Sequence, residues 1–527
     1  MGAVTTPVAG QALAAVSVPP IDYGAVAPVL VVLGVGCAGV LVEAFAPRRA
    51  RWAAQVVLGL AALVVAGAAV ALRALSGTGG VTTFSGSVAV DPPTLFLWGT
   101  LLALGLPALL MVADRAVEPG GAFVAEQARS SAAGPGAMSR AELAQHGMRT
   151  EVFPLLLFSL GSMMVFCAAN DLLTMFVALE ALSLPLYLLC GLARRRRLLS
   201  QEAAVKYFLL GAFASAFFLY GLALLYGYAG SVQLSAIAAA TGSSDRSGTL
   251  LFAGLGLLLV GLLFKASVGP FHTWTPDVYQ GAPTPVTAFM AACTKVAAFG
   301  GILRVLRVAF EASSVQWSGV LWAVAIASMA IGVVLGITQD DIKRMIAYSS
   351  VAHAGFLLVG AISLTGPGLA STLFYLLAYG FTTLAVFGVI SLVRRADGEA
   401  THLSDWAGLH RRSPLLAHTF AVLLAALGGI PLTSGFTGKF VVFSAALADG
   451  KAPLVVVALL ASAVAAFFYL RVIVLMYFSE PAADGPTVSV PGAFTAVAIA
   501  LGAVVTVLLG VLPALVLGWA GVGGFVS

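Results

Sequence analysis

The stretch FKASVGPFHTWTPDVYQGAPTPVTAFMAACTKVAAF, residues 264–299, decides how this chain folds. It places Lys265 and Lys295 inside runs that are otherwise apolar enough to cross a membrane. A charge at the centre of a bilayer costs about 3 kcal/mol or more, so a sequence keeps one mainly where it is used. Pro270 and Pro276 interrupt the first of these helices, because proline lacks the backbone donor that a helix needs. Buried ionisable groups beside a broken helix are what a path for protons or ions requires.

The composition extends this reading to the whole chain. Of its 527 residues, 60% are hydrophobic and 9% are charged, whereas a soluble protein carries about 25% charged residues. The chain is therefore an all-α polytopic membrane protein rather than a set of soluble domains. Its net charge of +5 comes mostly from loops, so it reports topology and does not indicate nucleic-acid binding.

A membrane-spanning helix needs about 20 mostly apolar residues, and fourteen such runs follow one another along the chain. They lie at 25–46, 52–74, 94–114, 151–169, 171–193, 203–229, 249–280, 286–309, 318–337, 344–364, 369–395, 414–447, 453–478 and 491–519. The seventh and twelfth runs are too long for one straight span and contain both Pro and Gly, which predicts that these two helices are broken.

The loops between these runs predict the orientation. If both termini lie outside, 17 of the 27 Lys and Arg residues fall in cytoplasmic loops, 5 in outer loops and 5 within spans. Because Lys and Arg accumulate on the cytoplasmic side, we expect a multi-pass protein of a bacterial plasma membrane with both termini extracytoplasmic. The asymmetry also favours an even number of helices.

The two broken helices indicate an internal repeat. The seventh run carries Lys265 close to Pro270, and the twelfth carries Lys439 close to Pro431. These runs lie five helices apart, and an odd separation inverts the second unit, as in many transporters. The expected divisions are an N-terminal tail at 1–24, helices 1–3 at 25–114, a cytoplasmic loop at 115–150, a first five-helix repeat at 151–309, a second inverted five-helix repeat at 318–478 and a C-terminal helix at 491–527.

Several ionisable residues lie within the runs. A buried lysine is a tunable proton carrier, because desolvation favours its neutral form and a nearby carboxylate favours its charged form. Lys265, Lys295 and Lys439 lie too deep to reach the membrane surface easily. Glu180 stands alone in the fifth run, and Lys206 in the sixth run is its expected counter-charge. Two other readings stay open: a structural ion pair that only locks two helices, and a Lys206 that reaches the interface beside Glu202.

Histidine can relay protons near neutral pH, which makes His353 in the tenth run and His272 in the first break candidates. Each could instead hold a structural hydrogen bond between helices. Tyr469 could extend a hydrogen-bonded chain, although packing is the usual role of a membrane tyrosine. We expect Asp277 to hold the broken segment rather than to carry protons.

Other chemistry has no motif here. The sequence contains no P-loop, no His/Cys cluster suited to an iron–sulfur centre, and no nucleophile motif. The energy for transport would therefore come from an ion gradient or from a partner.

The segment at 264–299, DIKRMIAYSSVAHAGF at 341–356 and GGIPLTSGFTGKF at 428–440 resemble the antiporter-like membrane subunits of respiratory NADH–quinone oxidoreductase, complex I. The sequence PDVYQGAPTPV within the first of these segments is similar to the corresponding sequence of subunit N, the ND2-type subunit. The resemblance covers residues 150–480 well and the first three helices loosely.

The resemblance implies a role for each candidate. Glu180 would be the fifth-helix glutamate, Lys206 the sixth-helix lysine that pairs with it, and Lys265 the seventh-helix lysine. Lys295 would link two half-channels from the eighth helix, His353 would be the central relay, and Lys439 would lie on the exit side.

The family also implies where the redox chemistry lies. No cofactor is expected in this chain, since NADH, FMN, iron–sulfur clusters and quinone belong to partner subunits. Other membrane-arm subunits and the lipid bilayer would be its partners. The alternative is a free-standing or Mrp-type cation/proton antiporter, which would exchange Na⁺ or K⁺ without NADH.

Overall fold

The computed structural model describes residues 21–77, 79–117, 122–123, 149–193, 197–243, 248–395, 398–481 and 485–526. Most of the expected N-terminal tail (1–24) and of the expected cytoplasmic loop (115–150) lies outside the described residues. The division into helices 1–3, two repeats and a C-terminal helix stays a prediction.

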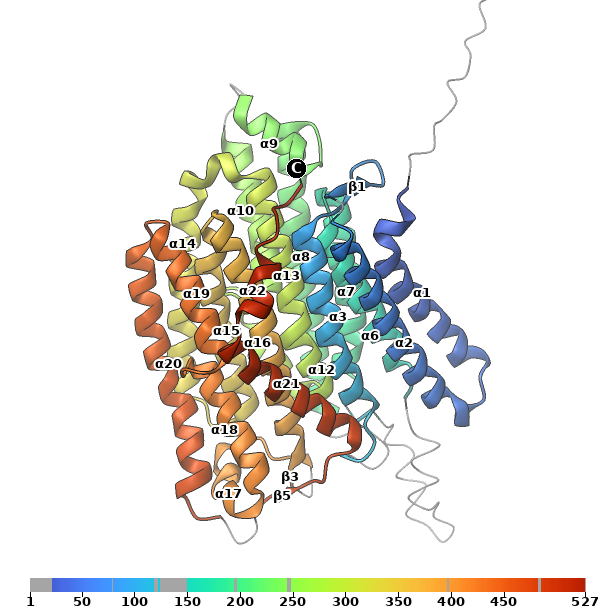
Figure 1. Cartoon of the computed structure of the whole chain (residues 1–527), viewed down its shortest axis with the longest axis vertical. Helices are drawn as coiled ribbons and strands as arrows, with labels where there is room; N and C mark the ends of the chain where they lie inside the picture. Colours follow the sequence, from blue (N-terminus) through green and yellow to red (C-terminus); the bar gives the residue numbers. More distant parts are fainter. Residues whose placement is uncertain are drawn as a thin grey trace, which may run out of the picture.

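The described chain is a bundle of long helices with two small antiparallel sheets (Figure 1). The helices of the first half are α1 (Tyr23–Phe45), α2 (Arg48–Leu75), α3 (Pro92–Ala113), α6 (Val152–Ala168), α7 (Leu172–Cys190), α8 (Arg197–Ala229), α9 (Leu234–Ser243), α10 (Gly248–Lys265), α11 (Trp274–Gly281), α12 (Thr284–Phe289) and α13 (Lys295–Arg304), with η1 (Met290–Thr294) and η2 (Val305–Ala309) as π-helical turns. The second half contains η3 (Glu311–Ser313), α14 (Ser314–Ile337), α15 (Ile342–Ile362), α16 (Gly366–Leu392), η4 (Leu403–Trp406), α17 (Leu409–Arg412), α18 (Pro414–Gly428), α19 (Ser434–Ala448), α20 (Ala452–Phe478), α21 (Ala493–Val511) and α22 (Ala514–Ala520).

Twelve helices among the described residues are long and apolar enough to cross a membrane, and α6, α18 and α19 are shorter apolar helices. Both expected breaks are present: α10 ends at Lys265 before α11 begins at Trp274, and α18 ends at Gly428 before α19 begins at Ser434. The count of fourteen spans and the inverted repeat stay predictions. The predicted run at 491–519 was wrong as one helix, because Pro513 separates α21 from α22.

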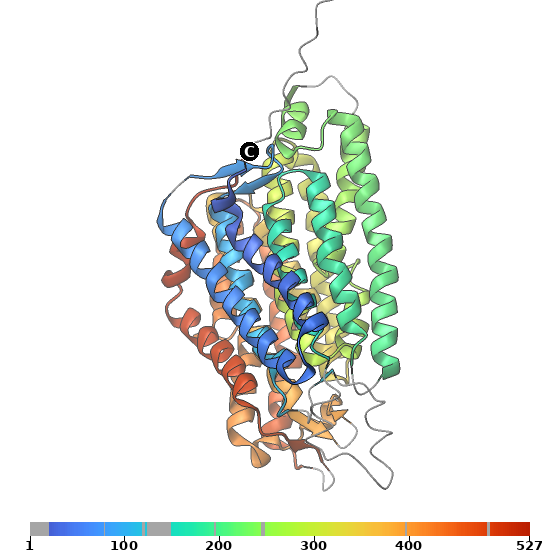
Figure 2. The ribbon, with the colours of Figure 1, turned by 90° about the vertical axis from the view of Figure 1, so that its right-hand side faces the viewer.

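The helices differ greatly in how far they are enclosed. In the most apolar 18-residue stretch of each helix, 94% of the residues are buried in α15 and in α16. Every residue of the corresponding stretch within 284–309 is buried. The corresponding value is 33–39% for peripheral helices such as α1, α8 and α20. Helices α1 and α20 lie at opposite edges of the bundle in Figure 1, and α8 lies at its right edge in Figure 2. Groups on the central helices are therefore shielded from lipid on every side.

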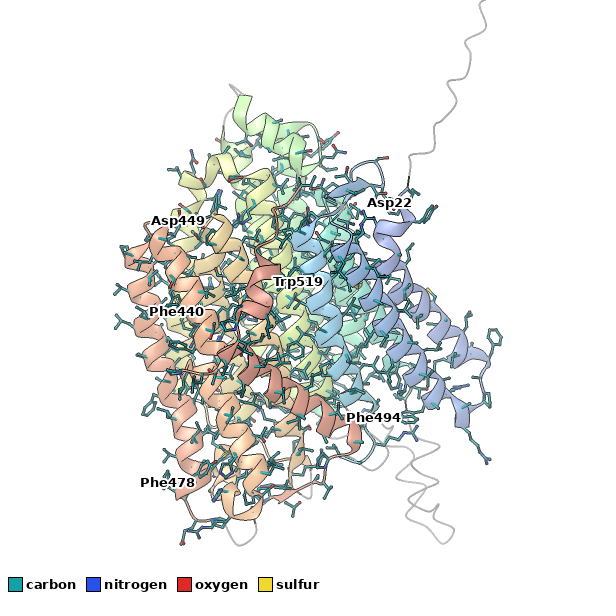
Figure 3. The ribbon with its side chains drawn as sticks, viewed as in Figure 1. Asp22, Phe440, Asp449, Phe478, Phe494 and Trp519 are labelled. Atoms are coloured by element: carbon teal, nitrogen blue, oxygen red, sulfur yellow. The ribbon has the colours of Figure 1, made fainter. Side chains whose placement is uncertain are left out.

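The outer wall is strongly apolar. Phe440 and Phe478 are 59% and 82% exposed and project away from the bundle (Figure 3). Contiguous exposed apolar surface of this kind fits a membrane and not water. The surface therefore agrees with the membrane class that the composition predicts.

Both ends of the described chain meet at the hairpin of β1 (Val81–Thr83) and β2 (Val88–Val90), at one end of the bundle (Figure 1). The Asp22 backbone N–H donates to the Thr83 hydroxyl over 3.0 Å, and the Val526 N–H donates to the Asp91 carboxylate over 3.1 Å. A chain whose ends lie together crosses its bundle an even number of times. The opposite end holds the sheet of β4 (Gly398–Glu399), β3 (Val393–Arg395) and β5 (Thr487–Val488).

A buried ion pair closes the hairpin end. Arg304 and Asp91 are both fully buried, and the guanidinium donates to the two carboxylate oxygens over 3.0 and 2.9 Å. The same guanidinium donates to the Cys167 carbonyl over 3.1 Å and lies 4.6 Å from the centre of the Phe525 ring. Asp91 also caps α3 by accepting the Thr94 N–H over 3.0 Å. One charge pair thus joins α3, α6, α13 and the C-terminal segment.

Candidate functional site

The first break places Lys265 in an aromatic pocket. Lys265 is the last residue of α10 and is 4% exposed. Its ammonium donates to the Tyr207 hydroxyl over 3.0 Å and lies 4.9 and 5.6 Å from the ring centres of Tyr207 and Tyr187. Aromatic faces stabilise a desolvated ammonium by a cation–π interaction. The site can therefore hold the lysine charged without an ion-pair partner.

The same break supplies an acceptor for Lys295. This lysine begins α13 directly after the π-helical turn η1 and is 2% exposed. Its ammonium donates to the Ala266 carbonyl over 3.3 Å and to the Ser350 carbonyl of α15 over 2.8 Å. The Ala266 carbonyl belongs to the end of α10, where carbonyls have no intrahelical donor. The interruption of the helix therefore creates the binding site of the lysine.

His353 lies one turn of α15 beyond Ser350 and is 1% exposed. Its Nδ1 is 2.7 Å from the Tyr375 hydroxyl, and its Nε2 is 3.3 Å from the Tyr469 hydroxyl. The Tyr469 hydroxyl also hydrogen-bonds to the Ser349 hydroxyl. Imidazole and hydroxyl groups both donate and accept, so this cluster can pass a proton along its hydrogen bonds.

The second break holds Lys439 as the first holds Lys295. Lys439 lies in α19, is 5% exposed, and donates to the Leu427 and Gly428 carbonyls at the end of α18 over 3.0 and 3.2 Å. It also donates to the Ser462 hydroxyl over 2.9 Å. Gly429 has a left-handed backbone with φ of 84°, and a Cβ there would lie 3.2 Å from the lysine Nζ. Glycine at this position leaves room for the ammonium.

The expected pairing of Lys206 with Glu180 was wrong. The Lys206 ammonium contacts the Glu202 carboxylate at 2.6 Å and the Asp277 carboxylate at 2.7 Å, and its side chain is 41% exposed. Asp277 in turn accepts from Arg344 of α15 at 2.6 Å. Asp277 does hold the broken segment, as expected, by joining α11 to α8 and α15. The wrong pairing followed from sequence proximity, which does not show which face of a helix meets which neighbour.

Glu180 lies at a half-buried position of α7, on the face that carries the exposed side chains of Leu173, Val177 and Leu184. Its Oε1 atom is buried and has no hydrogen-bond partner among the described residues. The carboxylate is close enough for its charge to interact with that of Lys265. Glu180 therefore belongs to the Lys265 end of the site and has an unsatisfied acceptor.

The candidate groups form a row through the centre of the bundle. Lys265 adjoins Ala266, whose carbonyl binds Lys295, and Lys295 reaches Ser350 one turn from His353. A positive charge on His353 would be close enough to Lys295 and Lys439 to be repelled by their ammonium groups. Backbone carbonyls accept hydrogen bonds but cannot release a proton. Transfer between the lysines and the histidine cluster would therefore need water.

A separate group of charges covers the row at the end opposite the hairpin. Lys343 forms an ion pair with Glu399, which also accepts a hydrogen bond from the Thr284 hydroxyl. Burial by itself would raise the pKa of the Glu399 carboxyl, but the Lys343 ammonium and the Thr284 hydroxyl outweigh it and lower that pKa. The loop beyond α16 is thereby tied to the first turns of α12 and α15.

Sequence reasoning missed the tyrosines and serine that hold the candidate groups. Tyr207, Tyr375 and Ser462 bind Lys265, His353 and Lys439 respectively. In the sequence, each of them is only a side chain with a hydroxyl group within an apolar run. Many side chains that serve only for packing have the same appearance. His272, a candidate in the first break, is 8% exposed with no partner for its Nδ1 among the described residues. His272 is therefore beside the row without a hydrogen bond to it.

Comparison with known proteins identifies the family. A family model described as NADH:quinone oxidoreductase/Mrp antiporter, TM, matches residues 169–465. NADH-quinone oxidoreductase subunit N of Saccharopolyspora erythraea is 78% identical over 97% of this chain and 99% of its own. The subunit N of Rhodococcus opacus is 57% identical over 95% of both chains.

Solved structures agree in fold. A chain of respiratory complex I from Thermus thermophilus with bound aureothin is 33% identical, with a TM-score of 0.75 over 94% of this chain and all of that one. A chain of the Mrp complex from Dietzia shares only the fold, at 22% identity and a TM-score of 0.78 over 95% of this chain and 97% of that one. With two broken helices, a buried row of lysines and full-length relatives of one kind, this chain belongs to the subunit N family of NADH-quinone oxidoreductases.

Proposed function

We propose that this chain translocates protons in the membrane arm of an NADH-quinone oxidoreductase complex, through Lys265, Lys295, His353 and Lys439. The observation that carries the proposal is that all four side chains are at most 5% exposed, yet each has specific hydrogen-bond partners. Retaining four buried ionisable groups is costly in a membrane. Structural ion pairs do not explain them, because none of the four has a carboxylate within salt-bridge distance among the described residues.

In this proposal, protons enter from the cytoplasm near Glu180 and Lys265. They cross by Lys295 and His353, and they leave by Lys439. The end that carries the hairpin and both ends of the described chain faces outward, because this orientation places most loop Lys and Arg residues inside. Water bridges the steps where the lysines contact only backbone carbonyls. A change of charge at one group alters the proton affinity of the next by Coulomb interaction in low dielectric.

Lys206 has a different part in this scheme. Its ion pair with Asp277 holds it near the cytoplasmic end of α8, so it is a positioning residue for the Lys265 end rather than a link in the row. Asp277 also binds Arg344 of α15, which ties the first broken-helix region to α15.

Partner subunits supply the redox chemistry. NADH, FMN, iron–sulfur clusters and quinone bind elsewhere in the complex, and electron transfer there drives proton transfer here. The described residues contain no group of three or more His, Cys, Asp or Glu side chains arranged to hold a metal ion.

Lys265→Ala tests the proposal in the assembled complex. The variant should assemble normally. It should lose NADH-driven proton uptake into inside-out membrane vesicles, because Lys265 lies in the proposed path. Lys451→Ala is the matched control, since Lys451 lies in a loop and pairs with Asp449. Normal pumping by fully assembled Lys265→Ala complex would contradict the proposal. Na⁺ or K⁺ exchange without NADH would favour the antiporter alternative.

A further inference from the structure

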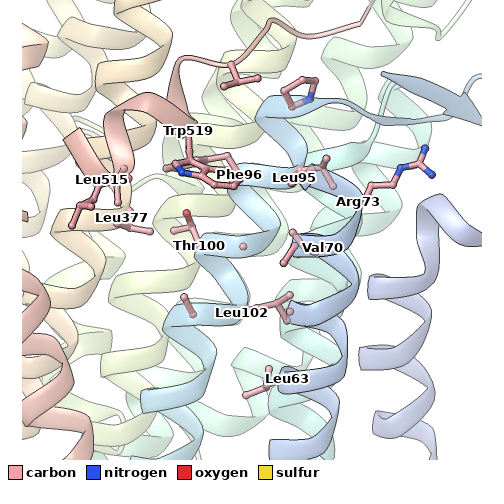
Figure 4. A pocket seen from close by; sticks show the side chains of 18 of the residues that line it. Leu63, Val70, Arg73, Leu95, Phe96, Thr100, Leu102, Leu377, Leu515 and Trp519 are labelled. Atoms are coloured by element: carbon pink, nitrogen blue, oxygen red, sulfur yellow. The ribbon is translucent and has the colours of Figure 1, made fainter. Parts of the chain in front are cut away.

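An apolar groove lies on the outer wall, away from the buried row. It has a volume of about 640 Å³ and runs between α2, α3 and α22, with Leu377 of α16 at its side (Figure 4). A volume of about 300–1,000 Å³ with mostly apolar walls and a few polar groups is typical of a small-molecule site. The walls include Leu63, Phe96 and Trp519.

Glycines leave the groove open. Gly67 of α2 and Gly99 of α3 line its two facing walls. A Cβ added at Gly67 would meet no atom within 4 Å, and one added at Gly99 would lie 3.9 Å from a Val70 methyl. Each glycine therefore removes side-chain volume that any larger residue would place inside the groove.

Two polar side chains that line the groove have hydrogen-bonding groups without a partner among the described residues. The Arg73 guanidinium lies at its upper end, 3.6 Å from the Asp22 carboxylate, and makes no hydrogen bond to any described residue. Thr100 is 1% exposed, and its hydroxyl has no hydrogen-bond partner in the described chain. Figure 4 shows Arg73 near the level of Leu95, with Thr100 below Phe96. A guanidinium at the mouth and a free hydroxyl within the groove point to an anionic amphiphile.

The length of the groove fits one leaflet of the membrane. Its α2 wall runs from Leu63 to Ala74, which is about 16 Å at about 1.5 Å per residue. Half of the hydrocarbon core of a bilayer is about 15 Å. Arg73 near the end of α2 is then at the depth of the headgroups, where guanidinium binds phosphate through paired hydrogen bonds.

We propose that this groove binds one anionic phospholipid of the leaflet at the hairpin end. An acyl chain fills the space beside Gly67 and Gly99, the phosphate binds Arg73, and an ester carbonyl accepts the Thr100 hydroxyl. A quinone fits less well, because its neutral head would offer the Arg73 N–H groups, which make no hydrogen bond to a described residue, only a carbonyl oxygen and not a charged phosphate. The bound lipid would cover the apolar face that α22 leaves open on α2 and α3.

A photoactivatable lipid tests the proposal in the purified complex. The complex is reconstituted in phosphatidylcholine vesicles containing phosphatidylglycerol with a diazirine on its acyl chain, irradiated, and mapped by peptide mass spectrometry. Crosslinks should concentrate on groove residues such as Phe96 and Trp519. Gly67→Phe should lower this labelling about tenfold by filling the groove, and Arg73→Gln about tenfold by removing a charge-assisted hydrogen bond.

Gly34→Phe is the matched control, because a Cβ added at Gly34 of α1 would also meet no atom within 4 Å, but Gly34 lies outside the groove. It should leave the labelling unchanged. Should Gly67→Phe fail to assemble, Arg73→Gln and the isosteric Thr100→Val decide the question. Labelling spread evenly over the outer wall, labelling insensitive to these variants, or competition by a quinone analogue but not by unlabelled phosphatidylglycerol would overturn the proposal.

Discussion

Lys295→Met should abolish proton transfer while leaving the protein folded. Lys295 is the ionisable group between the first break and α15, and its ammonium reaches a carbonyl on each side, at 3.3 Å and 2.8 Å. Methionine has a similar length and shape but cannot carry a proton. The row would then lack a group that binds and releases protons at its centre.

The structure indicates a small effect on stability. Losing two hydrogen bonds from a charged donor costs about 1.5–3 kcal/mol each. Removing the ammonium also removes the desolvation cost of a buried charge, which is several kcal/mol. These contributions oppose each other, so we expect a net change of about 1–2 kcal/mol, too small to prevent assembly.

Lys295→Arg separates a proton-carrying role from a structural one. Arginine keeps the positive charge and the donors but does not deprotonate in proteins. Both variants should lose NADH-driven acidification of inside-out vesicles, measured with a pH-sensitive dye and normalised to assembled complex on native gels. Normal pumping by Lys295→Arg would refute the reasoning, because a fixed charge would then suffice.

Three further substitutions probe the surrounding structure. Asp91→Ala should lower the free energy of unfolding by about 3–5 kcal/mol, because it leaves the buried Arg304 charge unpaired; a fall in Tm measures this, and the double variant Asp91→Leu/Arg304→Met should recover most of it. The pKa of Glu399 is lowered on folding, so its ion pair stabilises the protein above the ordinary glutamate pKa of about 4.3 and loses this contribution as pH falls through the lowered value. Glu399→Gln should therefore flatten the loss of Tm in acid, and an unchanged acid slope would exclude this role. Asp277→Asn should change Tm little, since partly exposed ion pairs contribute about 0.2–1 kcal/mol each, but it should reduce NADH-driven pumping because Lys206 keeps only Glu202 of its own helix and loses its ion pair with α11; normal pumping would show that this ion pair does not matter.

The broken helices and the buried row could be predicted because their signals are local. Proline and glycine beside a lysine mark a break in an apolar run, and α10 ends at Lys265 and α18 at Gly428. A lysine in the middle of such a run has to find acceptors inside the protein. The freed carbonyls of the break are those acceptors, at Ala266 and at Leu427.

The partners across helices could not be predicted from the chain alone. Lys206 binds Asp277, which is 71 residues away, and not the nearer Glu180. The rotation of each helix about its axis decides such contacts, and an apolar run with charges on few positions does not specify that rotation. The same reason explains why Tyr207 and Tyr375 were missed: nothing in a helix sequence tells which tyrosine points toward a lysine or a histidine.

The Arg304–Asp91 pair has a consequence for biosynthesis. Asp91 must wait for translation of Arg304 before its charge is neutralised, and the Val526 N–H reaches it only after a further stretch of chain, 435 residues beyond Asp91. Until that segment has been synthesised, the Asp91 carboxylate at the start of α3 lacks the last of its hydrogen-bond donors. Insertion can proceed helix by helix, but the hairpin end of the bundle can close only after Val526 has been synthesised.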